Sequence, residues 1–366
     1  MVEPGRSFTP PFCPHPRCDF HHRSVGWRFK KNGFHLRRFD QKKIQRYRCS
    51  HCRRTFSSQT FSTTYWLKRP DLLRPVLDGL LACSAYRQVA RARGVSPSTI
   101  EGQAARLGRH ALLFHEQLRP KRTPTEPLVL DGFETFEFSQ YWITHLNTLV
   151  GADSHYVYAT TVAELRRKGR MKPRQKKRRQ ELEQRYGRPD PKAIEKSVAD
   201  CLALVVQPGS QEIPLRTDEH QAYPRALRRL PDREFLHEQT SSKKPRTSRN
   251  PLFPINLLHG LMRHNGANHK RETIAWSKRN QGMLWRDAVH RVFRNYAKHF
   301  SERKKQGSPA MRLGILDRML GWSEILAQRL FVTRIPLAQP LEDYYWGRVK
   351  TRQIENCRAH ERQLAF

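Results

Sequence analysis

Two close pairs of cysteines near the start of the chain have the spacing of metal ligands: Cys13, Cys18, Cys49 and Cys52. Because no secretory signal accompanies them, thiolate ligation is favoured over disulfide bonds. Four thiolates bind Zn²⁺ tetrahedrally, and a segment this small needs a metal to fold. His15 and His51 lie between these positions and are alternative ligands, although histidines beside cysteine ligands are often bystanders. We predict a structural zinc site made of the four cysteines.

Two aspartates lie on or directly after runs that read as strands. Leu128-Val129-Leu130 leads to Asp131, and Leu215-Arg216-Thr217 leads to Asp218. Oxygen ligands on rigid strands suit Mg²⁺ or Mn²⁺, and two such ions about 3.5–4 Å apart can activate a hydroxyl nucleophile and stabilise the leaving oxygen of a phosphodiester. The alternative is that each aspartate caps the turn or helix that follows it.

The elements that must position these carboxylates form an α/β sheet. Residues 128–133, 142–150 and 156–162 read as strands, and the short gaps between them predict antiparallel pairing. Residues 213–217 read as a further strand, followed by a helix over 219–230. Alternation of strand and helix places the two aspartates in one α/β domain.

Helices are predicted over 191–206, 268–300 and 322–330, the last of them within a helical C-terminal extension over 301–366. Residues 164–192 are nearly all charged, which predicts a helix or arm beside DNA or, alternatively, an ordinary solvated helix. Proline-rich residues 120–127 form a linker.

The first 119 residues predict two small modules. Residues 10–62 carry the cysteines and read as a zinc ribbon. Residues 66–119 are helical, and Ser96-Pro97 provides an N-cap with proline at the first helical position. The pattern predicts a helix–turn–helix whose second helix enters the major groove, although any three-helix bundle can show it. Three polar positions of that helix are its candidate DNA contacts: Thr99, Gln103 and Arg106.

The composition points to a polyanionic partner. The 366 residues include 69 Lys and Arg against 33 Asp and Glu, a formal net charge of +36. Such a surplus favours salt-dependent binding to phosphates. No apolar run approaches the roughly 18 residues of a membrane span, so we expect no membrane partner and a cytoplasmic location.

Taken together, the ribbon, the helix–turn–helix, Leu-Asp-Gly and Thr-Asp resemble the bacterial insertion-sequence transposases, whose DDE-type catalytic domain has a ribonuclease-H-like mixed sheet with helices. The resemblance spans roughly residues 10–300, with the catalytic domain over 127–300 and the basic run as an insertion. It is strengthened by Arg263 and by the run Arg271-Glu-Thr-Ile-Ala-Trp-Ser-Lys278. In this family a similar run follows the third catalytic acid.

The position of that third acid is occupied by Asn256, which offers a neutral carbonyl oxygen in place of a carboxylate. The resemblance therefore implies an Asp-Asp-Asn site. Glu272 is the rival third ligand, or else forms an ion pair on a basic helix, and His259 is a more distant possibility.

The resemblance further implies catalytic Mg²⁺ or Mn²⁺, double-stranded DNA as the partner at element ends and target, location at the bacterial nucleoid, and a homodimer or larger assembly. It also implies that four basic residues contact DNA phosphates: Arg263, Lys270, Arg271 and Lys278. Two alternatives remain open. One is a DNA-binding regulator or inactive transposase relic, and the other is a metal-dependent nuclease of the same fold.

Overall fold

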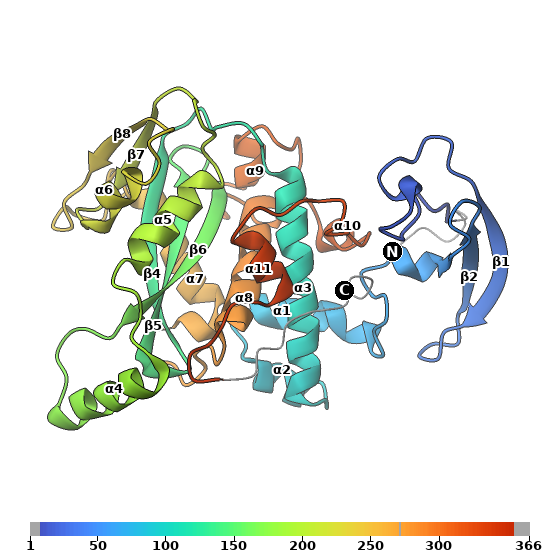
Figure 1. The fold of residues 1–366 in the computed structure, drawn as a ribbon, viewed down its shortest axis with the longest axis horizontal. Coiled ribbons are helices and arrows are strands. Elements are labelled where there is room, and N and C mark those ends of the chain that lie inside the picture. The colour runs from blue at the N-terminus through green and yellow to red at the C-terminus, as the bar shows by residue number, and fades with distance from the viewer. Residues whose placement is uncertain (1–7, 271, 355–366) are drawn as a thin grey trace.

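A five-stranded mixed sheet forms the centre of the protein. The computed structural model describes residues 8–270 and 272–354. The sheet has the order β6-β5-β4-β7-β8 (Figure 1). Its strands are β4 (Leu128–Glu137), β5 (Ser139–Gly151), β6 (Val157–Arg166), β7 (Ile213–Thr217) and β8 (Phe235–Gln239). The first three pair antiparallel, whereas β7 and β8 run parallel to β4. This arrangement confirms the predicted fold class, a ribonuclease-H-like mixed sheet with helices.

The pairing of β4 with β7 determines which residues share a level in the sheet. Leu128 lies opposite Leu215, and Val129 lies opposite Arg216. Continuing this register past the end of β7 brings Asp131 level with Asp218. Neighbouring strands lie about 4.8 Å apart, so the two aspartates are neighbours across the sheet.

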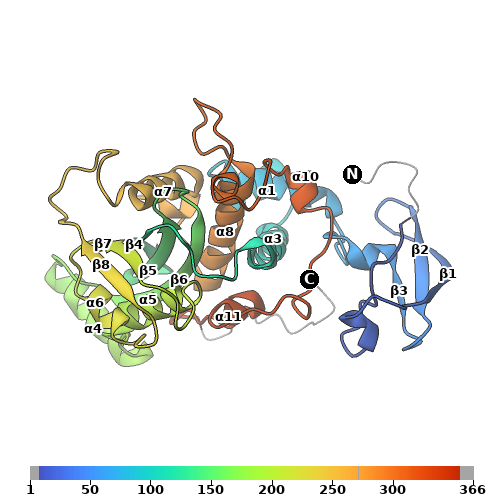
Figure 2. The same cartoon turned by 90° about the horizontal axis from the view of Figure 1, so that it is seen from above.

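Helices cover both faces of the sheet (Figure 2). On one face, α5 (Ala193–Ala203) packs against β5 and β6, and α6 (Ala222–Leu227) packs against α5. On the other face, α7 (Phe253–Asn265) packs against β4 and β5. Apolar residues of both layers and of the sheet belong to a single buried cluster.

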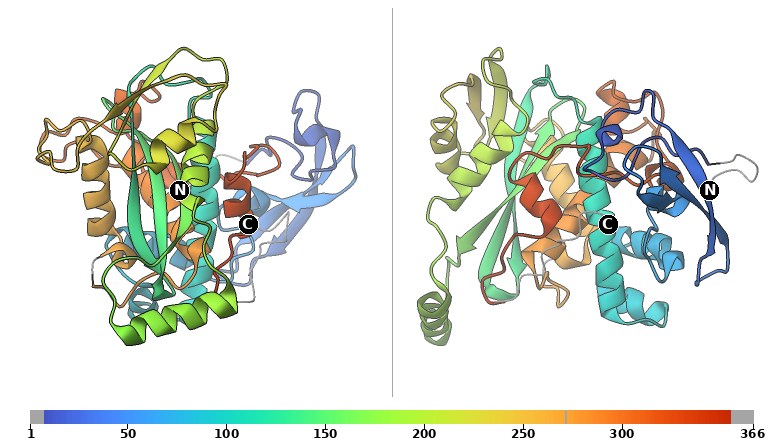
Figure 3. Two further views of the ribbon diagram at one scale, coloured as in Figure 1. Left: turned by 60° about the vertical axis from the view of Figure 1, so that its left-hand side comes forward. Right: turned by 45° about the vertical axis from the view of Figure 1, so that its right-hand side comes forward.

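From residue 8 onward, three α-helices precede the sheet: α1 (Leu73–Leu81), α2 (Tyr86–Ala92) and α3 (Pro97–Leu118). Gly94, at a φ of +60°, makes the turn before α3, and Ser96 caps α3 by accepting a hydrogen bond from the amide of Thr99. However, α3 is not confined to a small module. It packs along α8 (Asn280–Val292) and belongs to the same buried cluster as the sheet (Figure 3).

The N-terminal module is a small antiparallel sheet of β1 (Phe29–Leu36), β2 (Lys43–Cys49) and β3 (Thr55–Ser57). It lies at the end of the molecule away from the five-stranded sheet (Figure 1). The C-terminal segment joins it to the rest of the protein. Phe331 belongs to the core of the module, and His21 Nε2 lies 2.7 Å from Thr333 Oγ1.

The charged run after β6 contains the exposed helix α4 (Pro173–Tyr186). Up to residue 354, α8 is followed by a π-helical turn (Phe293–Ala297) and by three short α-helices: α9 (Pro309–Arg312), α10 (Trp322–Ile325) and α11 (Leu341–Trp346). Among the described helices, none combines the length and apolarity of a membrane span.

Several predicted elements differ from the structure. The helix predicted over 268–300 begins only at Asn280, because residues before it pair with the end of β4 through a bridge between Glu137 and Ser277. The helices predicted over 219–230 and 322–330 shorten to α6 and α10. The edge strand β8 was not predicted, since its exposed residues alternate weakly.

Candidate functional site

One pocket of about 710 Å³ is lined by Asp131, Asp218 and Asn256. These residues come from three elements: strand β4, the end of strand β7, and helix α7. The structure therefore brings together the two aspartates predicted from the sequence and the asparagine predicted as their partner.

The helix α7 presents a polar stripe to this pocket. Asn256, His259, Gly260 and Arg263 all line it. Their spacings of three and four residues place them on one side of a helix. Pro254 lies in the first turn of α7, where a proline costs the helix no internal hydrogen bond.

The carboxylate of Asp131 is held in a half-buried position. Its Oδ1 accepts hydrogen bonds from the amide of Gly132 at 2.7 Å and from the hydroxyl of Tyr223 at 3.3 Å. Burial raises the pKa of Asp131 to about 6, and repulsion by Asp218 adds to the rise, while these hydrogen bonds and Arg246 oppose it. Within the described residues, neither aspartate forms an ion pair with a lysine or arginine. Two neighbouring carboxylates with no such cation suit a divalent metal.

Two further side chains lie beside Asp131: Tyr223, for which the sequence predicts no role, and His259, the more distant of the possible third ligands. Tyr223, on α6, donates the hydrogen bond just described. His259 Nδ1 lies 3.8 Å from Asp131 Oδ2, and burial lowers the pKa of His259 to about 3, so its ring is neutral. An aromatic residue on a helix gives no sequence signal that it will reach a strand 92 positions away.

Gly132 leaves the space that the ring of His145 occupies. A Cβ at this position would lie 1.7 Å from Cε1 of His145, on the neighbouring strand β5. Real Cβ atoms do not approach other atoms so closely, so the glycine beside Asp131 is required by packing.

The rival third ligand lies elsewhere. Glu272 is exposed, adopts a φ of +53°, and is not among the residues that line the pocket. Arg271 lies outside the described residues. Among the other predicted phosphate contacts, Arg263 lines the pocket with its guanidinium 4.4 Å from the ring of Phe133, while Lys270 and Lys278 are exposed.

The prediction for helix α3 needs correction at two positions. Gln103 is 3% exposed and donates to the carbonyl of Arg69, and Arg106 is 5% exposed and donates to the carbonyl of Thr63. These side chains face the interior and are not available to DNA. Thr99 remains half-buried in the first turn, where its hydroxyl lies 3.0 Å from that of Ser96.

The four predicted zinc ligands form a compact cluster. Their sulfur atoms all lie within 4.8 Å of one another, with Cys13 and Cys52 3.7 Å apart and Cys18 and Cys49 4.0 Å apart. A tetrahedron with Zn–S bonds of about 2.3 Å has edges of about 3.8 Å. The cluster can therefore hold a metal such as zinc. His15 and His51 are not part of it.

The electrostatics of this cluster support ligation at Cys49. Burial raises the pKa of Cys49, but the indole of Trp27, which donates to its sulfur at 3.2 Å, and the amides of Cys52 and His51 outweigh burial and lower the pKa to about 7. Burial raises the pKa of Cys13 and Cys18, which a metal must overcome.

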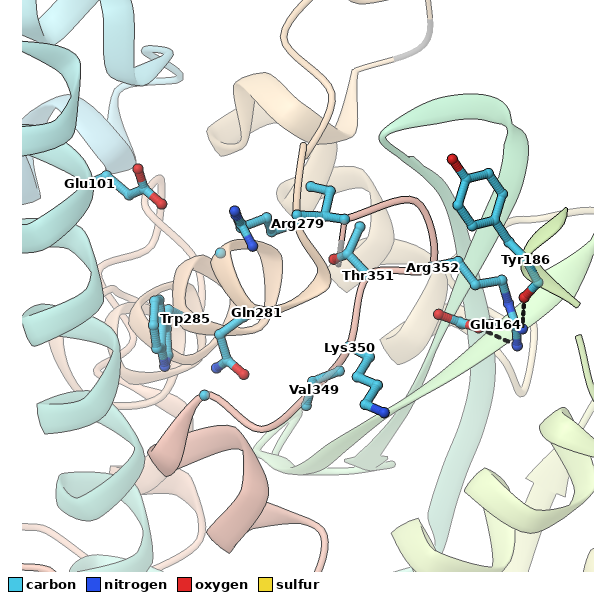
Figure 4. Close-up of a pocket in the computed structure, with 13 residues that line it drawn as sticks. Glu101, Glu164, Tyr186, Arg279, Gln281, Trp285, Val349, Lys350, Thr351 and Arg352 are labelled. Carbon is cyan, nitrogen blue, oxygen red and sulfur yellow. Dashed lines mark hydrogen bonds and ion pairs between the residues drawn. The ribbon is translucent and has the colours of Figure 1, made fainter. Parts of the chain in front are cut away.

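A second pocket, of about 430 Å³, lies where α8 begins (Figure 4). Arg352 closes one side of it by pairing with Glu164 at 2.8 Å and donating to the carbonyl of Tyr186 at 3.2 Å. Neither aspartate lines this pocket, and its charged side chains are of both signs. The two contacts of Arg352 join the C-terminal segment to β6 and to the end of α4.

Comparison with known proteins finds similar solved structures but no matching family. No protein-family model and no curated protein matches the chain. One solved structure that matches is the cryo-EM structure of the simian T-cell lymphotropic virus intasome in complex with PP2A regulatory subunit B56 gamma. The match has 11% identity and a TM-score of 0.22, and it covers 73% of this chain and 76% of that chain. The fold class follows from the strand order of the sheet itself.

Proposed function

We propose that this protein is a DNA transposase that binds the ends of an insertion sequence and catalyses metal-dependent strand cleavage and strand transfer. The observation that carries the proposal is the pocket that Asp131, Asp218 and Asn256 share. These residues are far apart in the sequence, and each was selected from the sequence for the same chemistry. The fold class and the charge of +36 agree with it.

On this proposal Asp131 and Asp218 would hold Mg²⁺ or Mn²⁺, and Asn256 would complete the ligand set with its carbonyl oxygen. The bound metal would activate water or a 3′-hydroxyl and stabilise the leaving oxygen of the phosphodiester. Tyr223 and the Gly132 amide orient the Asp131 carboxylate by donating to Oδ1. The neutral ring of His259 packs beside the same carboxylate without an added positive charge.

The proposal divides the remaining work among the other segments. Residues 10–62 and 66–119 would recognise the element ends, and residues 127–300 would perform catalysis, with the basic insertion at 164–192 beside the DNA. Residues 301–366 would form a helical extension that joins them. Pairing two ends of one element favours a homodimer or larger assembly on DNA.

The test is a strand-cleavage and joining assay on duplexes that carry the DNA bordering the gene, with Mg²⁺ or Mn²⁺. We expect Asp131→Asn and Asp218→Asn to lose activity by about 10³-fold or more while still binding the duplex, since each removes a metal ligand. Asn256→Ala should lose activity, whereas Glu272→Ala, at the rival position, should retain it.

The assay also separates the alternatives. Nicked products without joined strands would favour a nuclease of the same fold. Wild-type protein that binds the bordering DNA but cleaves no strand under either metal would favour a regulator or an inactive relic. Activity that survives Asp218→Asn would contradict the proposed site.

A further inference from the structure

A wide groove runs along the N-terminal module, remote from the aspartate pocket. Its volume is about 1100 Å³. One wall is the end of the β1–β2 hairpin, and the other is the segment from Thr55 to Lys68 that leads to α1. The five-stranded sheet lies at the other end of the molecule (Figure 2), so a ligand in this groove would bind independently of the aspartates.

The charge of the groove has one sign. Arg37, Arg38, Arg46 and Lys68 line it, and its lining includes no aspartate or glutamate. Arg37 is partly neutralised because it pairs with Asp40. The other three are exposed, and within residues 8–270 and 272–354 none of them forms an ion pair. A ligand complementary to this surface is a polyanion.

Large aromatic rings stand exposed in the same groove. Phe39 is 44% exposed and Trp66 is 66% exposed. Trp66 adopts a φ of +62°, a conformation that a bulky residue rarely takes. The ring of Tyr65 lies 6.0 Å from that of Trp66, and the guanidinium of Arg329, in the C-terminal segment, lies 5.0 Å from the Tyr65 ring.

We infer that this groove binds single-stranded DNA, with Trp66 and Phe39 stacking on unpaired bases and the cations holding the phosphates. Exposed rings beside cations fit a polyanion that has apolar planar faces. In a duplex those faces are stacked inside the helix, so an intact duplex offers the groove only its phosphates. The choice of DNA over RNA rests on the proposed function, but the binding itself needs no catalytic residue.

The test measures binding of a labelled oligonucleotide of mixed sequence as a single strand, as the matched duplex, and as RNA. Full-length protein carrying Asp131→Asn and loaded with zinc is used throughout, so binding is measured without cleavage. We expect Trp66→Ala and Phe39→Ala each to weaken single-strand binding by about tenfold, because a stacked base is lost, with little effect on the duplex. Trp66→Phe should retain most of the affinity.

The matched control is Phe34→Ala, because Phe34 is 61% exposed on the same hairpin but does not line the groove. It should leave single-strand affinity unchanged. Indole fluorescence should fall when the single strand binds, and Trp66→Ala should remove most of that change. Zinc content and circular dichroism establish that each variant is folded.

Three results would overturn the inference. These are equal losses on single strand and duplex, no loss from either aromatic substitution in folded protein, or tighter binding of RNA than of DNA. Failure of the cleavage assay would leave this experiment unaffected, so the groove and the catalytic site can be rejected separately.

Discussion

Opposing influences meet at the carboxylate of Asp131. Burial and the neighbouring Asp218 favour its protonated form, while the amide of Gly132 and the hydroxyl of Tyr223 favour its charged form. The sequence could indicate both aspartates because each follows residues that read as a strand, a local pattern; in the structure Asp131 lies within β4 and Asp218 directly follows β7. It could not indicate Tyr223, whose contact depends on how α6 packs beside β4.

The packing at Gly132 makes a prediction for this site. In Gly132→Ala the new methyl group would overlap the ring of His145, so the ring or strand β4 must shift. We expect the unfolding free energy to fall by about 1–3 kcal/mol, as in overpacked cores. Cleavage should decline with it, since Asp131 moves with the strand. Denaturant unfolding and the cleavage assay measure the two effects.

The matched control is Gly260→Ala, at a glycine that lines the same pocket from α7. A Cβ there would have no atom within 4 Å. Alanine in a helix is favoured over glycine by about 1 kcal/mol, so this variant should be as stable as the wild type or slightly more so. Equal destabilisation by the two substitutions would contradict the clash.

At the scale of elements, the N-terminal module depends on its cysteine cluster. Apart from Phe331, its buried core consists of a few aromatic residues and the cysteines themselves. Such a core is too small to fold without a metal. We expect one zinc ion per chain, and Cys49→Ala should lose it and open this module to proteases. Metal analysis and limited proteolysis measure the outcome.

Cys83→Ala is the control for that variant, because Cys83 is a free thiol outside the cluster. It should keep its zinc and its resistance to proteases. The five-stranded sheet should remain folded in both variants, since its core is a separate buried cluster. Retention of zinc by Cys49→Ala would show that another residue, such as His51, supplies the ligand.

Glu137 joins two elements and makes the stability depend on pH. It is 2% exposed at the end of β4 and accepts a hydrogen bond from the amide of Asn280, where α8 begins. Burial raises its pKa to about 8, with Glu164 adding to the rise and Thr351 opposing it. The folded protein therefore binds this proton more tightly than the unfolded chain does, and this contribution to stability is lost as the pH rises from 4.5 to about 8.

Glu137→Gln should remove that pH dependence, because glutamine keeps the shape without the charge. We expect the variant to match the wild type near pH 4.5 and to exceed it above pH 8, by on the order of 2–4 kcal/mol. Denaturant unfolding at both pH values measures the difference. The comparison variant is Glu134→Gln, which removes an exposed carboxyl from the same strand. A constant difference across the pH range would contradict the buried proton.

The whole molecule explains where reasoning from the sequence succeeded and where it failed. The cysteine cluster, the three antiparallel strands and the capped start of α3 depend on local patterns, and all appear in the structure. The polar face of α3 was misread as a DNA-binding surface. Gln103 and Arg106 are covered by the segment before α1, where the carbonyls of Arg69 and Thr63 accept their hydrogen bonds. Farther along α3, His110 donates to the carbonyl of Ile325, 215 positions away. Helical periodicity cannot reveal such a cover.

The C-terminal segment also connects parts of the chain that the sequence predicts as separate modules. Arg329 donates from its amide to the carbonyl of Phe61, and Leu326 accepts a hydrogen bond from Thr63. The segment thereby contacts the chain that leaves the zinc module, while its neighbour Ile325 contacts α3. The N-terminal module and the sheet are therefore held together by the C-terminal segment, for whose residues the sequence alone predicts no chemical role.

The distribution of charge over the whole molecule predicts how DNA lies on it. The loop at 241–249, beside the aspartate pocket, is exposed and contains Lys243, Lys244, Arg246 and Arg249 with no acidic residue. If these cations contact phosphates, substituting Lys243, Lys244 and Arg249 with glutamine should reduce the slope of log K against log salt by about 2–3. Duplex binding measured from low to moderate salt gives the slope, and an unchanged slope would contradict the contact.

The comparison variant removes the same charge from α4, by substituting Lys176, Lys177 and Arg178 with glutamine. The sequence predicts that this helix also lies beside DNA. However, α4 follows the edge strand β6, whereas the loop at 241–249 follows β8, the opposite edge strand (Figure 1). A reduced slope in both variants would require a duplex long enough to pass both edges of the sheet. A reduced slope in the loop variant alone would confine the duplex to the neighbourhood of the aspartate pocket. Because each lost phosphate contact changes the slope by about 0.9, the two slopes count the contacts at each end.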